Sequence, residues 1–213
     1  IFGALAGAHG AGLWLRGQDS WRPALGEVFS VLGTMLFGAG IWLVAQIYNI
    51  DEHYPNGFLF WGLGALALAW ALDSVPQGIL AVVTLTIWGL TECLGFDREL
   101  GWSLVLVIGG LAPLVWRKRS AVLAAVLLAG VYALLLTNAG EWGGGSAAFA
   151  AAMSLSVLLV AAAKLRPAGT EYDRLGAVLR FYGLVGFLVC AYLLSFRHTA
   201  EHLLRWREGA GAA

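Results

Sequence analysis

The sequence predicts an all-α integral membrane protein, a bundle of about eight transmembrane helices with short loops. Of its 213 residues, 60% are hydrophobic and only 12% are charged, whereas a soluble domain has about 25% charged residues. A globular core cannot hide so much apolar surface. The apolar residues form long continuous runs, without the apolar–polar alternation of barrel strands. A soluble enzyme, a secreted disulfide scaffold and a disordered chain are therefore excluded.

Gly, Pro and charged residues divide the chain into eight helix candidates. Six of them reach the roughly 17–25 residues that a membrane helix needs, and the first and the fifth are shorter. The predicted helices cover residues 1–15, 26–48, 55–72, 76–95, 101–116, 120–138, 145–164 and 175–196. Because the connections are short, we expect sequence neighbours to pack antiparallel. Residues 1–196 form the predicted bundle, and 197–213 form a short amphipathic C-terminal tail.

Lys and Arg in the connections predict the orientation. If the helices alternate in direction, one side collects most of these residues, whereas the connections on the other side contain only Arg98. The residues on the first side are Arg16, Arg22, Arg117, Lys118, Arg119, Lys164, Arg166 and Arg174. This side is predicted to be cytoplasmic, so Ile1 lies outside. The formal net charge is zero, and no nucleic-acid partner is expected.

The most informative stretch follows the second predicted helix. Its apolar run closes with Gln46, Tyr48 and Asn49, and Asp51 and His53 come directly after. A polar amide one turn inside a membrane helix is costly without a partner, so Gln46 should face other helices or water. Gln46, Asn49 and His53 would share one face if the helix continued. Two interpretations stay open, a polar helix end at the interface or a ligand-facing cluster of these five residues.

Glu92, near the outer end of the fourth predicted helix, is a second candidate for ligand binding. A charged side chain costs about 2.5–3.5 kcal/mol at the centre of a membrane and less near its edge. Together with acids in the outer loops, Glu92 could concentrate cations by focusing, or it could reflect the ordinary scarcity of basic residues outside. No catalytic or metal-ligating residue is assigned, and no cofactor is identified. Cys93 and Cys190 are expected to be buried free thiols rather than a disulfide.

Small residues recur at every fourth position of the first predicted helix. Gly3, Gly7 and Ala11 form one such face, and Ala8 and Gly12 form another. Small faces let helix backbones approach closely in a membrane. They predict tight packing within the bundle or association with a helix of another subunit or a second copy.

A set of glycine, polar and aromatic positions is shared with a known family. The set comprises Gly33, Leu36, Gly38, Gly40, Gln46-Ile47-Tyr48-Asn49-Ile50, Asn56-Gly57 and Trp61-x-Leu63-Gly64-Ala65-Leu66-x-Leu68-Ala69. Through these residues the segment from about Leu25 to Trp70 resembles the bacterial membrane family called domain of unknown function 2157, and the similarity extends over about residues 1–95. The resemblance implies a bacterial cytoplasmic membrane and a further helix before Ile1. It brings no activity and no functional residue.

Two functions are compatible with these observations. The first is permeation or transport of a small solute or ion, which predicts a polar cavity that reaches Gln46, with His9, Tyr132 or Thr137 nearby. The alternative is a scaffold or accessory subunit of a larger membrane complex, which predicts a closed bundle whose small-residue faces are covered by another chain. We favour the first, because Gln46 and other polar residues in the spans would be costly in a mere spacer. An intramembrane enzyme is disfavoured because no acid–base pair is visible.

Overall fold

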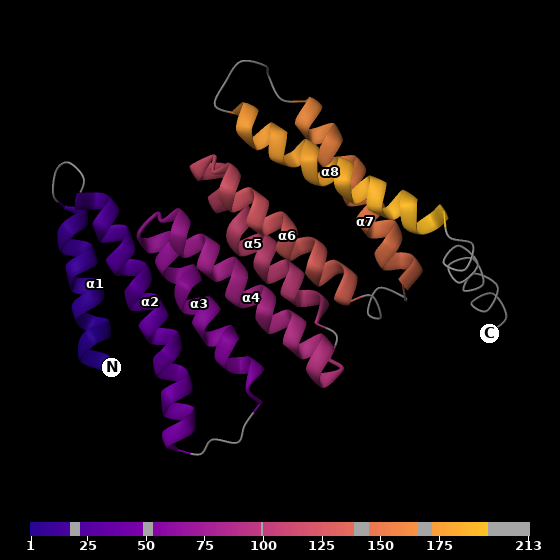
Figure 1. The fold of residues 1–213 in the computed structure, drawn as a ribbon. Helices are drawn as coiled ribbons and strands as arrows, with labels where there is room; N and C mark the ends of the chain where they lie inside the picture. The colour runs from indigo at the N-terminus through magenta and orange to yellow at the C-terminus, as the bar shows by residue number, and fades with distance from the viewer. Residues whose placement is uncertain (18–21, 49–52, 99, 139–144, 166–171, 196–213) are drawn as a thin grey trace. The chain divides into compact units, whose positions relative to one another are not determined.

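The computed structural model describes residues 1–17, 22–48, 53–98, 100–138, 145–165 and 172–195, and these residues form eight α-helices and no strand (Figure 1). The helices are α1 (Phe2–Arg16), α2 (Arg22–Ile47), α3 (Pro55–Ala71), α4 (Val75–Phe96), α5 (Gly101–Lys118), α6 (Ala121–Thr137), α7 (Gly145–Lys164) and α8 (Tyr172–Ser195). The predicted all-α class is confirmed, and so are eight helices. The predicted tail over 197–213 lies outside the described residues.

Four of these helices are long and apolar enough to cross a membrane. The four spans are Pro23–Ile47, Val75–Phe96, Ala147–Lys164 and Arg174–Ser195. The helices α1, α3 and α6 have 15, 17 and 17 residues, and a helix of 17 residues is only about 26 Å long, against a hydrocarbon core of about 30 Å. The chain is therefore a membrane protein by helix length and composition. That all eight helices cross stays a prediction.

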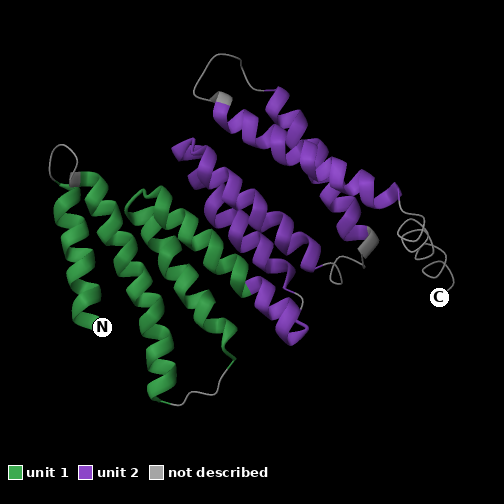
Figure 2. Cartoon of the chain, viewed as in Figure 1, with its two compact units in different colours: residues 1–88 green, residues 89–213 purple. Residues whose placement is uncertain are grey.

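The chain divides into two compact units, residues 1–88 and residues 89–213 (Figure 2). The boundary falls inside α4, so the first unit contains α1, α2, α3 and most of α4. The second unit contains the end of α4 and the helices α5 to α8. The prediction of a single bundle over residues 1–196 stays a prediction.

In the first unit, small residues allow α1 and α2 to pack at close range. A Cβ atom on Gly12 would lie 2.5 Å from Oγ of Ser30, and one on Gly33 would lie 2.8 Å from the ring of His9. Real Cβ atoms do not approach other atoms so closely, so the two backbones meet only because both positions are glycine. The imidazole of His9 is thereby held against the backbone of α2.

The two small faces of α1 have different surroundings. Ala8 and Gly12 are buried, and they form the contact with α2. Gly3 and Gly7 are exposed, and a Cβ atom on either would meet nothing within 4 Å. The predicted tight packing inside the bundle is therefore confirmed for the face of Ala8 and Gly12. At Gly3 and Gly7 no described residue covers the other face.

Aromatic rings of α2 and α3 lie against glycines of the opposite helix. At Gly38 and Gly64 the ring occupies the space that a Cβ atom would need, and at Gly57 it leaves little room for one, so the two helices interlock through large and small side chains. The three pairs are Trp61 with Gly38, Phe37 with Gly64, and Trp42 with Gly57. On the far side of α3, Gly62 receives the side chain of Leu85 from α4 in the same way.

In the second unit, α6 packs against α5, α7 and α8. The hydroxyl of Tyr132 on α6 lies 2.9 Å from Oγ of Ser156 on α7, within hydrogen-bonding distance. Gly186 on α8 meets the same point, because a Cβ atom there would lie 2.6 Å from Oγ of Ser156 and 2.7 Å from the Tyr132 hydroxyl. This hydrogen bond therefore joins three helices.

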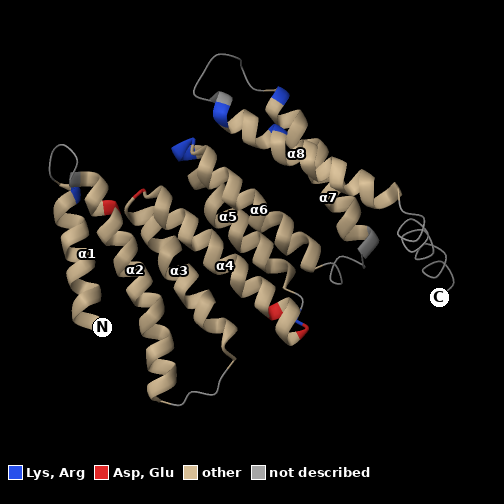
Figure 3. Ribbon diagram, viewed as in Figure 1, with Lys and Arg blue, Asp and Glu red and all other residues tan. Residues whose placement is uncertain are grey.

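Cationic side chains of the second unit gather where α5 ends, where α7 ends and where α8 begins (Figure 3). Antiparallel neighbours bring these three helix ends to the same side of the unit, as the sequence predicts. The opposite side of the unit, where α4 ends, carries Glu92, Asp97 and Arg98 among the described residues. The charge distribution agrees with the predicted orientation, which itself stays a prediction.

Candidate functional site

A cavity of about 470 Å³ lies in the first unit between α1, α2 and α3. Its volume falls within the range of roughly 300–1,000 Å³ that is typical of small-molecule sites. It is lined by the start of α1, the second half of α2 and the start of α3. The lining residues are Ile1, Phe2, Leu5, Phe37, Gly40, Ile41, Trp42, Val44, Ala45, His53, Tyr54, Asn56, Gly57 and Phe60.

The polar side chains of the lining all come from the turn that begins α3. His53 and Tyr54 precede the helix, Pro55 occupies its first position, and Asn56 follows. Proline suits this position because the N–H group it lacks would have no partner inside the helix. The backbone N–H of Asn56 donates to the carbonyl of His53 at 3.2 Å, and that of Gly57 donates to the carbonyl of Tyr54 at 3.0 Å. This turn therefore holds three polar side chains at one end of an otherwise apolar cavity.

Trp42 forms a fixed part of the cavity wall. A Cβ atom on Gly57 would lie 3.3 Å from Cζ2 of Trp42, so the indole lies directly on the backbone of α3. The ring of Phe58 meets the indole edge to face, with centroids 5.2 Å apart at 64°. Such aromatic pairs stabilise by about 0.5–1.5 kcal/mol beyond their buried area. Two adjacent residues of α3 therefore hold this part of the wall in place.

Of the predicted ligand-facing residues in this part of the chain, His53 lines the cavity. Gln46 and Tyr48 are exposed, with Tyr48 at 73%, and neither is among the lining residues. Asn49 and Asp51 lie outside the described residues. The described part of this stretch therefore contributes one side chain to the cavity and two to the surface.

Glu92 belongs to the second unit, where it is 3% exposed. Its backbone carbonyl accepts a hydrogen bond from the N–H of Arg98 at 3.0 Å. Beside it, Oδ1 of the fully buried Asn138 accepts from the backbone N–H of Leu100 at 2.6 Å and from the thiol of Cys93 at 3.1 Å. These contacts tie the connection between α4 and α5 to the end of α6.

Neither cysteine forms a disulfide, as expected. Cys190 is buried, whereas Cys93 is only half-buried. Among the residues that the structure describes, no three His, Cys, Asp or Glu side chains are grouped so that they could hold a metal ion.

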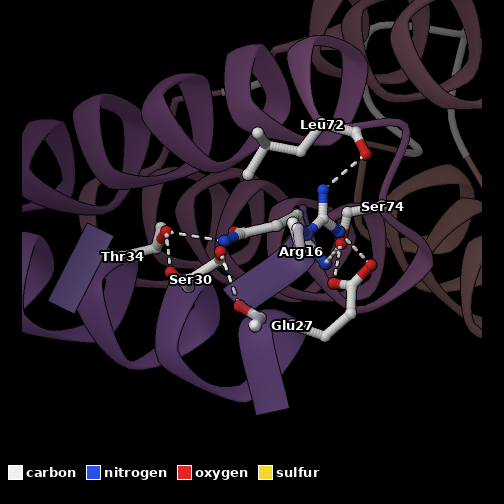
Figure 4. A network of polar contacts seen from close by, with 8 residues as sticks. Arg16, Glu27, Ser30, Thr34, Leu72 and Ser74 are labelled. Carbon is white, nitrogen blue, oxygen red and sulfur yellow. Dashed lines mark hydrogen bonds and ion pairs between the residues drawn. The ribbon is translucent and has the colours of Figure 1, made fainter. Parts of the chain in front are cut away.

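At the end of the first unit opposite the cavity, polar side chains join α1, α2 and the turn between α3 and α4 (Figure 4). Arg16, at the end of α1, forms an ion pair with Glu27 on α2. Its Nη1 also donates to the carbonyl of Leu72 at 2.7 Å. Oγ of Ser74 donates to the second carboxylate oxygen of Glu27 at 2.6 Å. One ion pair and two hydrogen bonds therefore close this end of the unit.

A second part of this network runs deeper between α4 and α2. Nε2 of Gln77 donates to Oγ1 of Thr34 at 2.9 Å. The hydroxyl of Thr34 donates in turn to the carbonyl of Ser30, and that of Ser30 donates to the carbonyl of Gly26. Gln77, Thr34 and Ser30 are fully buried, and Oε1 of Gln77 has no hydrogen-bond partner among the described residues.

The sequence carried signals for this network that the prediction did not use. Glu27 is the one acid in the α2 sequence, and an acid in a membrane helix calls for a named partner. Gly26, Ser30 and Gly33 are small residues spaced four and three positions apart, which places them on one face of α2. The aromatic lining of the cavity carried no such signal, because Phe37 and Trp42 look like any other apolar residues of a membrane helix.

Residues 1–78 match the model of a family described as "Predicted membrane protein (DUF2157)". No curated protein and no solved structure matches the chain significantly. The family match covers α1, α2, α3 and the first turn of α4. It therefore contains every residue that lines the cavity and every residue of the polar network at the opposite end. The resemblance found in the sequence is confirmed over this part of the chain, which is similar to a family of predicted membrane proteins.

Proposed function

We propose that the first unit binds a small amphipathic molecule, mainly apolar with one polar end, in the cavity between α1, α2 and α3. The observation that supports this proposal is the composition of the lining, which is aliphatic and aromatic apart from His53, Tyr54 and Asn56 at one end. Ligand pockets in general combine an apolar lining with a few placed polar groups. An amphipathic ligand satisfies both parts of this cavity.

This proposal narrows the transport interpretation. Permeation of a hydrophilic solute needs a polar cavity that reaches Gln46, whereas the lining is apolar and does not include Gln46. His9 packs on Gly33 of α2, and Tyr132 and Thr137 belong to the second unit. An apolar molecule with a polar end is therefore a better candidate for the cargo than an ion.

The test is photo-crosslinking of a fatty acid that carries a diazirine in the middle of its chain, with the full chain in detergent micelles. Gly40→Leu fills the cavity, because Gly40 lines it and a Cβ atom there would meet only Ile1 at 3.9 Å. We expect crosslinks within residues 37–45 and 53–60, reduced roughly tenfold in this variant, which corresponds to about 1.4 kcal/mol. Gly109→Leu on α5 is the matched control, since a Cβ atom on Gly109 also meets nothing within 4 Å.

The proposal would be rejected by labelling that is spread over all lipid-facing helices, with as much on α8 as on α2, and that does not change in Gly40→Leu. Leucine also has a higher helix propensity than glycine, by at most about 0.8–1.0 kcal/mol, so neither substitution should weaken its helix. A loss of labelling in Gly40→Leu alone is therefore not explained by unfolding.

The accessory-subunit interpretation remains a second candidate, and the exposed glycine face of α1 favours it. Gly3, Gly7 and Gly10 have open space around them, and small residues in membrane helices are typical of contacts between helices. If another helix covers this face, Gly7→Leu should reduce the size of the complex extracted in mild detergent, and Gly109→Leu should not. An unchanged size in Gly7→Leu would remove the support for this candidate.

A further inference from the structure

The lining residues of the cavity lie at three levels along the helix axes. Because α1 and α3 run in one direction and α2 in the other, positions increase toward the polar end on α2 and decrease toward it on α1 and α3. Leu5 and Phe37 form the innermost level, because His9 lies against Gly33 and Phe37 lies against Gly64. Ile1 lies beside Gly40 at the middle level, where Phe60 is one turn from Gly64, and Ala45 and His53 form the outermost level. From Phe37 to Ala45 the cavity extends over about 12 Å at 1.5 Å per residue.

Phe37 closes the inner end, and α3 supports it from behind. A Cβ atom on Gly64 would lie 2.8 Å from Cε1 of Phe37, so the ring is in direct contact with the α3 backbone. The next residue of α2, Gly38, lies against the indole of Trp61. These two contacts fix the separation of α2 and α3 at this level. The ring of Phe37 therefore has a firm support on α3, and the 37% of this side chain that stays exposed includes the surface that forms the inner end of the cavity.

The polarity of the cavity follows that of one half of a bilayer. The polar side chains lie where the helices end, the apolar lining runs inward along α2, and α2 is long enough to cross the membrane. Tyr54, at the polar end, is 49% exposed, and tyrosine is typical of the level of lipid headgroups. A lipid chain in the adjoining leaflet already has this direction and this order of polar and apolar parts.

We propose that the occupant of the cavity is an acyl chain of a phospholipid from the leaflet next to the α2–α3 connection, and that Phe37 sets the longest chain the cavity accepts. This inference rests on the proposed function, since it names the class of ligand and the residue that selects it. The headgroup lies beside His53, Tyr54 and Asn56, and the chain tip meets the ring of Phe37. Chains that are too long for the cavity stay in the bilayer.

The experiment uses the full chain in vesicles of phosphatidylethanolamine and phosphatidylglycerol. A trace of phosphatidylglycerol carries a diazirine at the tip of one chain, in a series of increasing chain length. We expect crosslinks to Leu5 and Phe37 to rise with chain length to a maximum and then to fall. Phe37→Ala should move the maximum to longer chains, with several-fold more crosslinking of the longest ones. Phe37→Leu should give an intermediate shift.

Phe181→Ala is the matched control, because this phenylalanine is 62% exposed on α8 and should leave the chain-length profile unchanged. If the cavity is labelled but Phe37→Ala has the wild-type profile, Phe37 is not the selecting residue and the proposed function stands. If the fatty acid in micelles labels the cavity and no phospholipid does, the ligand comes from water and the lipid assignment is wrong. If neither probe labels the cavity, the proposed function fails as well.

Discussion

Gln77 on α4 and Thr34 on α2 are joined by a hydrogen bond of 2.9 Å from Nε2 to Oγ1, and both side chains are fully buried. The residues are 43 positions apart, so this contact belongs to the tertiary fold of the first unit. Together with the ion pair of Arg16 and Glu27, it closes the end of the unit that lies opposite the cavity. The first unit is therefore tied together by polar contacts at one end and hollow at the other.

The buried amide of Gln77 predicts that a double variant is more stable than one of its single variants. Thr34→Val leaves Nε2 of Gln77 buried without its acceptor and should lower the free energy of unfolding by about 0.6–1.7 kcal/mol, from the average to the largest value of such bonds between membrane helices. Gln77→Leu also removes an oxygen that has no described partner. The double variant should therefore lie closer to the wild type than Thr34→Val alone. Unfolding by sodium dodecyl sulfate in mixed micelles measures all three, and a double variant less stable than Thr34→Val would contradict this account.

The ion pair at the same end predicts that lysine replaces Arg16 only in part. Lysine keeps the charge but lacks the planar fork that reaches both Glu27 and the carbonyl of Leu72. We expect Arg16→Met to cost about 1.5–3 kcal/mol, as for hydrogen bonds to charged groups. The cost stays below the 3–5 kcal/mol of a fully buried pair, because the two side chains are 19% and 30% exposed.

Thermal unfolding in detergent checks this order. Arg16→Lys should fall between the wild type and Arg16→Met, and Arg180→Met on the exposed surface of α8 should have no effect. Equal stability of Arg16→Met and Arg180→Met would show that the network does not hold α1 in place.

The helices could be predicted from the sequence because each is an apolar run with Gly, Pro or charged residues at its ends. The largest difference lies at the start of α2, predicted at residue 26 and found at Arg22. Pro23 occupies the first turn of this helix, where proline is tolerated, so it did not mark an end. The match over residues 1–78 ends before the predicted limit of the resemblance at about residue 95.

The site could be predicted only in part, because a cavity depends on which helix faces meet. His53 was found since a polar residue beside a membrane helix stands out by itself. Phe37 and Trp42 become lining residues only through the glycines of α3 on which they lie. Likewise, the pairing of Gln77 with Thr34 requires α4 to pack beside α2, which no pattern within one helix reveals.

The contact of Trp61 with Gly38 predicts opposite effects of the same substitution at two glycines. Gly38→Ala places a methyl group inside the space of the indole and should destabilise by about 1–3 kcal/mol, as overpacking does. Gly7→Ala has open space around it and should stabilise by about 0.5–1 kcal/mol. Chemical unfolding in micelles measures both. Trp61→Leu added to Gly38→Ala should restore part of the loss, and a neutral Gly38→Ala would refute the close approach.

The hydrogen bonds of Asn138 predict that one substitution changes both the stability of the protein and the reactivity of the Cys93 thiol. Asn138→Leu leaves the N–H of Leu100 without its acceptor and removes the oxygen that accepts from the thiol of Cys93, at a cost of about 1–3 kcal/mol. In a Cys190→Ser background, Cys93 should react faster with a membrane-permeant maleimide. Thr137→Val is the control, because its hydroxyl donates within its own helix to the carbonyl of Ala133. If the reactivity of Cys93 is unchanged in Asn138→Leu, the hydrogen bond to Asn138 does not control the reactivity of this thiol.

The short helices α3 and α5 allow a direct test of how many helices cross the membrane. If α3, with 17 residues, and α5, with 18, both cross the membrane, cysteines at exposed positions before and after each helix must react from opposite sides. With Cys93 and Cys190 changed to Ser, we expect an impermeant maleimide to label Tyr54→Cys and Arg98→Cys on intact cells. Ala71→Cys and Arg117→Cys should react only after the membrane is opened.

The positive-inside rule supports this assignment, because the cations at the end of α5 are costly to move across a membrane. Labelling of Arg98→Cys and Arg117→Cys from the same side would mean that α5 does not cross, and likewise for Tyr54→Cys and Ala71→Cys with α3. In the second case the polar end of the cavity and the Arg16 network would face the same compartment. The cavity could then not follow the polarity of one leaflet, so this experiment also decides whether a lipid chain can enter it in the proposed direction.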